Sequence, residues 1–128
     1  MPNNMTLTRA YEGKRDLVTS MTYKRATTTV VNRGYTYDAL ARPVTRTTAR
    51  QKTTRNDAFT YNSRSELVAA TLGTAPYGYG YDNIGNRKTA QELADELTYA
   101  ANQLNQYASI TKGEEAPFVP TYDANGNQ

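Results

Sequence analysis

The stretch YGYDNIGNR at residues 79–87 decides how this sequence folds. Side chains alternate between the two faces of a β-strand, so Tyr79 and Tyr81 lie on one face of a predicted strand. Asp82 follows directly, and an aspartate side chain can bond the backbone two residues on, which starts a turn. Gly85 stands where a hairpin loop of three to five residues needs a positive φ. The stretch therefore predicts a strand, an Asx-type turn and a second strand.

The same pattern recurs along the chain. Clear copies are YTYDALAR (35–42), FTYNSRSEL (59–67) and YDANGN (122–127), and weaker ones are YEGKRDL (11–17) and LTYAAN (97–102). Anchor tyrosines at positions 11, 37, 61, 81, 99 and 122 have a mean spacing of about 22 residues, and such a period indicates a repeat architecture. The residues that define the repeats are Tyr35, Tyr37, Asp38, Phe59, Tyr61, Asn62, Tyr79, Tyr81, Asp82, Gly85, Arg87, Tyr99, Tyr122, Asp123 and Gly126.

The repeats predict an all-β fold, in which tandem β-hairpins form an open, twisted or spiralling antiparallel sheet. Residues 1–10 are an N-terminal extension, and residues 11–128 hold about six repeats that begin near 11, 35, 59, 79, 97 and 120. Four copies have another residue at the glycine position: Arg15, Ala41, Ser65 and Gln103. An L-residue in the left-handed region costs about 1 kcal/mol or more, so we expect these turns to differ in geometry or length.

Residues 90–104 allow two interpretations. Leu93, Leu97, Ala101 and Leu104 follow the spacing of one helical face, among good helix formers. The repeat frame instead requires a strand at residues 97–99. We expect the strand, because a helix would interrupt the sheet and tertiary context often overrides local propensity. Residues 112–117 predict a turn or an exposed loop.

Composition excludes several kinds of chemistry. The 128 residues include no His, Cys or Trp, but 11 Tyr and 2 Phe. Without His or Cys there is no Ser-His or Cys-His nucleophile, usual zinc site or disulfide. Asp38, Asp82 and Asp123 occupy equivalent repeat positions, and we interpret them as turn-starting residues rather than acid–base pairs. The sequence therefore predicts a non-catalytic protein without a cofactor or metal.

Charge is distributed unevenly. Residues 1–64 hold 12 basic and 4 acidic residues, a net charge of +8, whereas residues 65–128 hold 3 and 8, a net charge of −5. A polyanion site, head-to-tail stacking of molecules and two solvated sheet faces are alternative explanations. Nucleic-acid binding is not expected, because packing within the sheet accounts for the tyrosines more simply. Exposed tyrosines beside Asn, Asp and Arg are also compatible with a glycan.

The tandem Y-x-Y-D units, best seen at residues 35–42 and 79–87, resemble the Rhs/YD-repeat family. The resemblance implies a segment of a spiralling β-sheet shell that encloses a C-terminal toxin or effector of a secreted or envelope-associated bacterial protein. Its partners would be the rest of the parent polypeptide and the enclosed effector. The alternative is a surface carbohydrate-binding or adhesion module. Open sheet edges also predict self-association. Apolar runs are too short for a membrane span, and the first residues predict no signal peptide in this chain.

Overall fold

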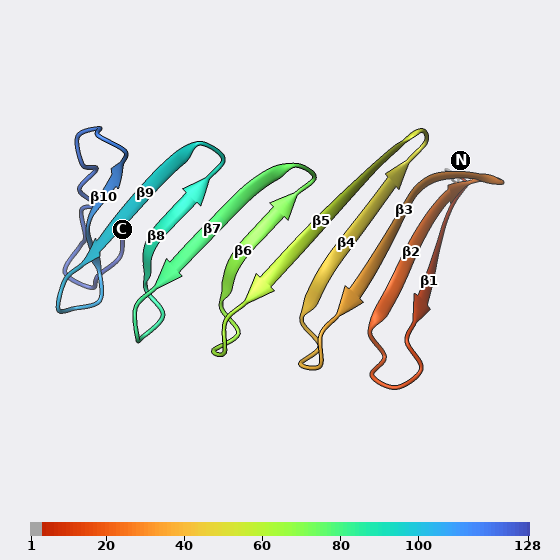
Figure 1. Cartoon of the computed structure of the whole chain (residues 1–128), viewed down its shortest axis with the longest axis horizontal. Coiled ribbons are helices and arrows are strands. Elements are labelled where there is room, and N and C mark those ends of the chain that lie inside the picture. The colour runs from red at the N-terminus through yellow and green to blue at the C-terminus, as the bar shows by residue number, and fades with distance from the viewer. Residues whose placement is uncertain (1–3) are drawn as a thin grey trace. The chain divides into compact units, whose positions relative to one another are not determined.

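The structure is a computed structural model that describes residues 4–128, and in this range all regular elements are β-strands. Each strand runs antiparallel to its neighbours, and the strands form an open sheet in chain order (Figure 1). This confirms the predicted all-β class and antiparallel hairpin sheet. The strands are β1 (Met5–Tyr11), β2 (Val18–Arg25), β3 (Thr28–Tyr37), β4 (Pro43–Arg50), β5 (Thr53–Tyr61), β6 (Leu67–Leu72), β7 (Ala75–Tyr81), β8 (Arg87–Glu92), β9 (Asp95–Ala101) and β10 (Tyr107–Lys112).

The chain divides into two compact units. The first comprises Met1–Thr60 and Thr71–Thr74, and the second comprises Tyr61–Ala70 and Ala75–Gln128. In the first unit, strands β1 to β5 pair successively. In the second, strands β7 to β10 do the same. Residues 4–128 contain no helix that is long and apolar enough to cross a membrane.

Two kinds of connection alternate along the chain. One kind is an Asx turn of about five residues, as between β3 and β4 or between β7 and β8. The other is a two-residue loop at 26–27, 51–52, 73–74 or 93–94, and the first residue of each has a positive φ. The chain thus alternates a longer turn with a tight hairpin loop.

Strand alternation gives the first unit two different faces. On one face, cross-strand register aligns Tyr35 with Arg46 and then Asp57. We call this the arginine face. On the opposite face, hydroxyl and amide side chains bond across the strands in the pairs Thr22–Asn32, Thr36–Thr45 and Thr47–Asn56. Polar cross-strand pairs of this kind stabilise a sheet face that is exposed to solvent.

Few side chains are buried in the described part of the chain. The buried hydrophobic residues there are Val31, Ala70 and Ala90, and no large side chain is fully buried. Asp57 is the most deeply buried polar residue, with 2% of its surface exposed. Backbone pairing, cross-strand contacts and side-chain hydrogen bonds therefore hold this sheet together, instead of a packed apolar core.

Residues 90–104 form the end of β8, the two-residue loop, β9 and the start of the next turn rather than a helix, and residues 97–99 lie in a strand, as expected from the repeat frame. Residues 5–10, predicted as part of an N-terminal extension outside the repeats, form most of β1 and pair with β2. Residues 113–115 form a turn, which confirms the interpretation of that segment. A single bridge then joins Phe118 to Ile110.

The expectation of different turns at Ala41 and Ser65 is wrong. Their φ values are 64° and 65°, in the same region as Gly85 and Gly126. The backbone of Ala41 bonds that of Asp38 in the same pattern as Gly85 bonds Asp82. The side-chain hydrogen bonds of the turn, described below, offset the cost of a left-handed L-residue.

The first turn does differ in length, as expected for the copy with Arg15. The N–H of Glu12 bonds the carbonyl of Leu17, a span one residue longer than that from Asp38 to Arg42. Its left-handed residue is Asp16, with a φ of 52°.

Candidate functional site: the Asx turns and tyrosine links

Each five-residue turn is built around one carboxyl or amide oxygen. Oδ1 of Asp38 accepts hydrogen bonds from the N–H groups of Leu40, at 2.9 Å, and Arg42, at 3.0 Å. The backbone adds a bond from the N–H of Asp38 to the carbonyl of Arg42. The same pair of side-chain bonds is made by Asn62, Asp82, Asn102 and Asp123. These residues start turns, as the sequence predicts for the three aspartates.

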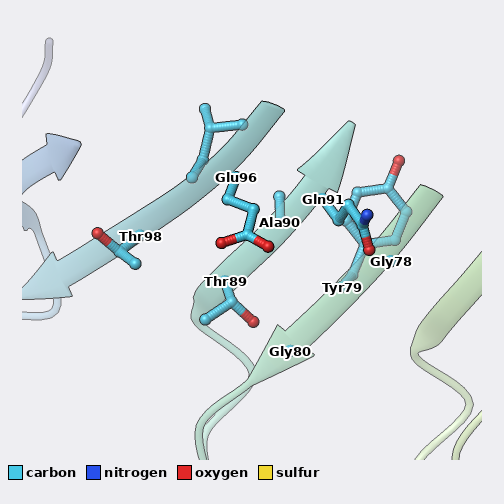
Figure 2. A pocket seen from close by; sticks show the side chains of 9 residues that line it. Gly78, Tyr79, Gly80, Thr89, Ala90, Gln91, Glu96 and Thr98 are labelled. Carbon is cyan, nitrogen blue, oxygen red and sulfur yellow. The ribbon is translucent and has the colours of Figure 1, made fainter. Parts of the chain in front are cut away.

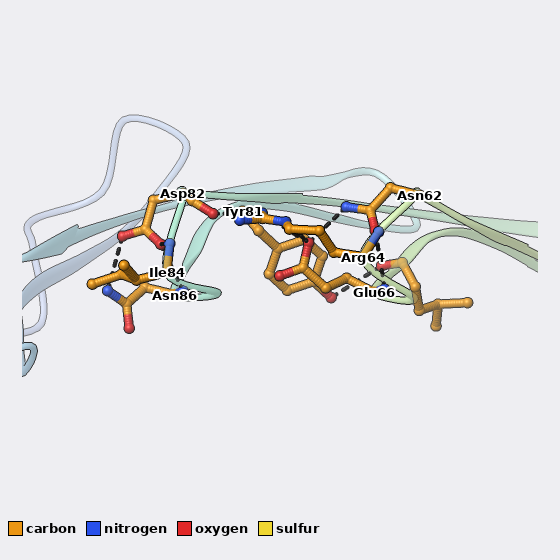
Figure 3. A network of polar contacts seen from close by, with 8 residues as sticks. Asn62, Arg64, Glu66, Tyr81, Asp82, Ile84 and Asn86 are labelled. Atoms are coloured by element: carbon orange, nitrogen blue, oxygen red, sulfur yellow. Dashed lines mark hydrogen bonds and ion pairs between the residues drawn. The ribbon is translucent and has the colours of Figure 1, made fainter.

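The first and fifth residues of these turns match in hydrogen-bonding character (Figure 3). Where the first is Asp, the fifth is a donor, as in Asp82 with Asn86 at 2.8 Å. Where the first is Asn, the fifth is an acceptor, as in Asn62 with Glu66 at 2.6 Å. The remaining pairs obey the same rule: Asp38 with Arg42, Asn102 with Gln106, and Asp123 with Asn127. Sequence reasoning missed this pairing, although the residue types alone could have revealed it.

Hydrogen bonding stabilises the charged form of the turn aspartates. The side chain and backbone of Asn127 hold the pKa of Asp123 below its ordinary value. At Asp82, desolvation opposes ionisation, but bonds from Asn86, Ile84 and Gly85 outweigh it and lower the pKa. Hydrogen bonds within its own turn therefore keep each of these carboxylates ionised near neutral pH.

Tyrosine hydroxyls link successive turns. The hydroxyl of Tyr37, at the end of β3, donates to the carbonyl of Val18 at 2.8 Å, and Val18 begins the strand after the preceding turn. In the second unit, the hydroxyl of Tyr81 donates to Leu67 at 3.0 Å and that of Tyr122 donates to Tyr107 at 3.2 Å. We call these three bonds the tyrosine links. They give a physical reason for tyrosine, rather than phenylalanine, at these anchor positions.

Two arginines link turns in the opposite direction along the chain. Arg15 donates through Nη1 to the carbonyl of Asp38 at 2.6 Å, and its Nη2 lies 3.0 Å from Oε2 of Glu12. Arg64 donates through Nη2 to the carbonyl of Asp82 at 2.6 Å, and Glu66 lies 2.9 Å from the same atom (Figure 3). A carboxylate in the same turn thus positions the guanidinium that bonds the next turn.

Aromatic rings form part of the sheet surface in the second unit. The guanidinium of Arg87 lies over the ring of Tyr79, at 4.7 Å from its centroid, and 5.8 Å from that of Tyr99. The rings of Tyr99 and Tyr107 meet at 5.3 Å with a tilt of 52°. In the first unit, Arg46 lies over Phe59 at 5.8 Å. These rings contact neighbouring side chains of the sheet, which favours a structural role for them.

The fifth repeat is placed differently from the sequence alignment. The structure ends β9 at Ala101 and starts the turn at Asn102, so Ala101 takes the position of Tyr81. Tyr99 corresponds to Tyr79, two residues before the end of the strand. The left-handed residue of this turn is Asn105, with a φ of 66°, and not Gln103. Alignment on the nearest tyrosine gave the wrong anchor, because this repeat has no tyrosine there.

Asp57 is a buried charged residue that sequence reasoning did not single out. Its Oδ2 lies 2.7 Å from Nη2 of Arg46, and its Oδ1 lies 3.0 Å from both Nε of Arg55 and the N–H of Gly73. Burial opposes ionisation, but the bond and charge of Arg46, the charge of Arg55 and the bond from Gly73 outweigh it and lower the pKa of Asp57. This carboxylate binds two strands and one hairpin loop of the first unit together.

Alternate glycines leave an open groove on the second unit (Figure 2). Gly78 and Gly80 of β7 lie at its floor, beside Thr89 and Gln91 of β8. Its volume is about 420 Å³, and Glu96 and Thr98 of β9 line its other side. A Cβ at Gly80 would meet Oγ1 of Thr89 at 2.5 Å, so a larger residue here would force the Thr89 side chain to move. The groove offers hydroxyl, amide and carboxylate groups to solvent.

The three turn aspartates do not come together as an acid–base pair. Asp38, Asp82 and Asp123 lie in separate turns, each bonded within its own turn. Residues 4–128 contain no group of three or more acidic side chains that could hold a metal ion.

Comparison with known proteins gives no family model and no curated protein that matches this chain.

Proposed function

We propose that this chain is a structural repeat segment, similar to the wall of an Rhs/YD-repeat shell that encloses a C-terminal toxin or effector. Its role would be to separate an enclosed volume from solvent, without catalysis by the segment itself. The partners would be the remaining repeats of the parent polypeptide and the enclosed effector. The protein would be secreted or associated with the cell envelope.

The tyrosine links carry this proposal. Each ties an anchor tyrosine to the carbonyl that follows the preceding turn, as from Tyr37 to Val18 and from Tyr81 to Leu67. A contact that repeats with the hairpins is expected of a module in which each unit is stabilised mainly by its neighbours. A wall of this kind needs no apolar core of its own, in agreement with the few buried side chains.

Protease protection tests the proposal. The full reading frame that contains this chain is expressed with its downstream segment and digested with a protease. A downstream segment that is enclosed resists digestion, whereas the double variant Tyr37→Phe/Tyr81→Phe, which weakens the wall, lets it be cleaved faster. The matched control Tyr35→Phe/Tyr77→Phe keeps both tyrosine links and leaves protection unchanged. Rapid cleavage in the unmutated protein would contradict enclosure.

The second candidate function is a surface carbohydrate-binding or adhesion module, which the groove over Gly78 and Gly80 favours. Sugar hydroxyls could bond Gln91, Glu96 and Thr98 there. Tyr79 also lines the groove, but strand alternation directs its side chain to the face opposite those of Thr89 and Gln91, so its ring gives a sugar no stacking platform there. A glycan array distinguishes the two: binding that Gln91→Ala removes, while Gln51→Ala in an exposed loop leaves it intact, would favour adhesion.

A further inference from the structure

Four arginines surround a single threonine on the arginine face of the first unit. Thr48 lies in β4 between Arg46 and Arg50, which share its face because side chains alternate. Cross-strand register places Arg33 of β3 directly opposite Thr48 on one side and Arg55 of β5 opposite it on the other. Directly opposed residues have their Cβ atoms about 5 Å apart. The small side chain at the centre leaves an open cavity of about 500 Å³ that all four arginines line.

The cavity is only partly neutralised. Asp57 pairs with Arg46 and Arg55, whereas Arg33 and Arg50 form no ion pair with any residue from 4 to 128. The four guanidiniums and this one carboxylate therefore carry a net charge of +3. Such a concentration of like charge is unfavourable in the free protein and favours an anion that fits between the side chains.

Asp57 also positions two of the guanidiniums. Its carboxylate contacts Nε and Nη2 of both Arg46 and Arg55. The Nη1 groups of both arginines therefore stay available to another acceptor. The face of Arg46 lies over Phe59, which restricts it further. Fixed guanidinium groups lose less conformational entropy when they bind a ligand.

We propose that this cavity is a binding site for a tetrahedral oxyanion, a phosphate or sulfate group. Such a group offers several charged oxygens in different directions, which matches guanidiniums that converge from three strands. The hydroxyl of Thr48 at the cavity wall supplies a further donor. This site goes beyond the proposed wall function and does not depend on it.

Calorimetric titration with matched ligands tests the site. Glucose 6-phosphate and glucose 6-sulfate present the two groups on the same sugar, glucose is the uncharged control, and glutamate is the carboxylate control, all at constant ionic strength. We expect both sugar esters to bind at least about tenfold more tightly than either control. A preference between the two esters identifies the group that the site favours.

Two pairs of variants locate the binding. Arg33→Gln/Arg50→Gln removes the two unpaired guanidiniums and should weaken the sugar esters at least about tenfold. Lys14→Gln/Lys24→Gln removes the same charge from exposed positions outside the arginine cluster and should change affinity less than about twofold. Thr48→Glu places a carboxylate at the centre and should abolish binding, while Ala49→Glu, one residue along and on the opposite face, should not.

Specific results would overturn the proposal. If glutamate binds as tightly as the sugar esters, the site binds anions in general and is not specific for a tetrahedral group. If both double variants lose affinity equally, binding depends on the overall positive charge of the unit and not on this cavity. Thr48→Glu also provides a readout that needs no ligand. Its carboxylate would lie among four guanidiniums, so its thermal midpoint should be higher than that of Ala49→Glu. A lower midpoint would show that the arginines do not converge closely on this position.

Discussion

The Asx turns and the two-residue loops both connect antiparallel strands, but different contacts stabilise them. Both reverse the chain and both place a residue at positive φ, as at Ala41 in a turn and Leu93 in a loop. The turns add side-chain bonds from the first residue, and tyrosine or arginine links to another turn. The loop at Leu93 is held by a backbone bond to the carbonyl of Pro76. Sequence identity between the repeats is therefore required mainly at the turns, where side chains make the contacts.

One loop departs from this division. Gly73 donates its N–H to the carboxylate of Asp57, which reaches it from the middle of β5. The added Cβ in a Gly73 variant would lie 3.3 Å from Cγ of Arg55, in a residue whose φ is already +70°. This loop is bonded to a buried carboxylate, so the difference between turns and loops can be tested here first.

The largest effect is expected from Asp57→Ala. This change leaves Arg46 and Arg55 without their shared carboxylate and removes one of the two acceptors of the Gly73 N–H. Because both guanidiniums are partly exposed, the loss should be about 1–3 kcal/mol, less than for a pair buried on both sides. Urea denaturation measures the free energy of unfolding. Asp57→Asn keeps the shape and one acceptor and should lose less. A loss below about 1 kcal/mol for the alanine variant would show that the pair is in effect solvated.

Acid should destabilise the protein through the same kind of group. The folded pKa values of Asp38, Asp57, Asp82 and Asp123 are all lowered. Their contribution to stability is therefore full above the unfolded value of about 3.9 and is lost as the pH falls through the folded values. Urea titrations at pH 7, 4 and 3 should show a decline below pH 4. Asp57→Asn should make that decline shallower.

Turn chemistry was predictable from the sequence because it is local. Asp82 and the residues that it bonds lie within five positions, so the short motif contains all the residues that determine the turn. The Asp57 cluster was not predictable in this way, since it depends on pairing between Arg46 and Asp57 across the hairpin. That register follows from a tight loop at 51–52, where Gln51-Lys52 lacks the Asn-Gly or Asp-Gly pattern that marks such loops.

The fifth repeat shows a second limit. A motif search depends on tyrosine, and Ala101 replaces it at the anchor position, so only the strand end and the bonds of Asn102 reveal the repeat. The segment is still a strand despite its helical spacing, because pairing with its neighbours outweighs local propensity.

The tyrosine links give a smaller expected effect. Tyr37→Phe removes one hydroxyl-to-carbonyl bond and leaves the ring, so the free energy of unfolding should fall by about 1 kcal/mol. Tyr35→Phe, two residues earlier on the same strand, is the matched control and should change stability by less than about 0.5 kcal/mol. Equal effects at both positions would mean that the ring, and not the hydroxyl, is what the anchor position requires.

Backbone strain should be alike at the two kinds of connection. Ala41→Gly in a turn and Leu93→Gly in a loop each relieve a left-handed L-residue, but glycine also gains freedom in the unfolded chain. The net gain should be about 0.5 kcal/mol at each site, measured by urea denaturation. A gain at Leu93 with a loss at Ala41 would show that the Asx bonds of the turn depend on the side chain at its fourth position.

The smallest effect tests the matching of first and fifth turn residues. Asp82→Asn sets a second amide donor against Nδ2 of Asn86, which can accept only by flipping its amide and giving up its bond to Asn105, so the thermal midpoint should fall slightly. Adding Asn86→Glu recreates the pair found between Asn62 and Glu66 and should restore the midpoint. Asn86→Glu alone sets two carboxylates against each other and should be the least stable of the three. In a double-mutant cycle these changes must therefore be non-additive, with the double variant more stable than the two single changes imply. Additive changes would mean that the five observed pairs reflect separate preferences at each position, and the turn would then be specified by its backbone bonds alone.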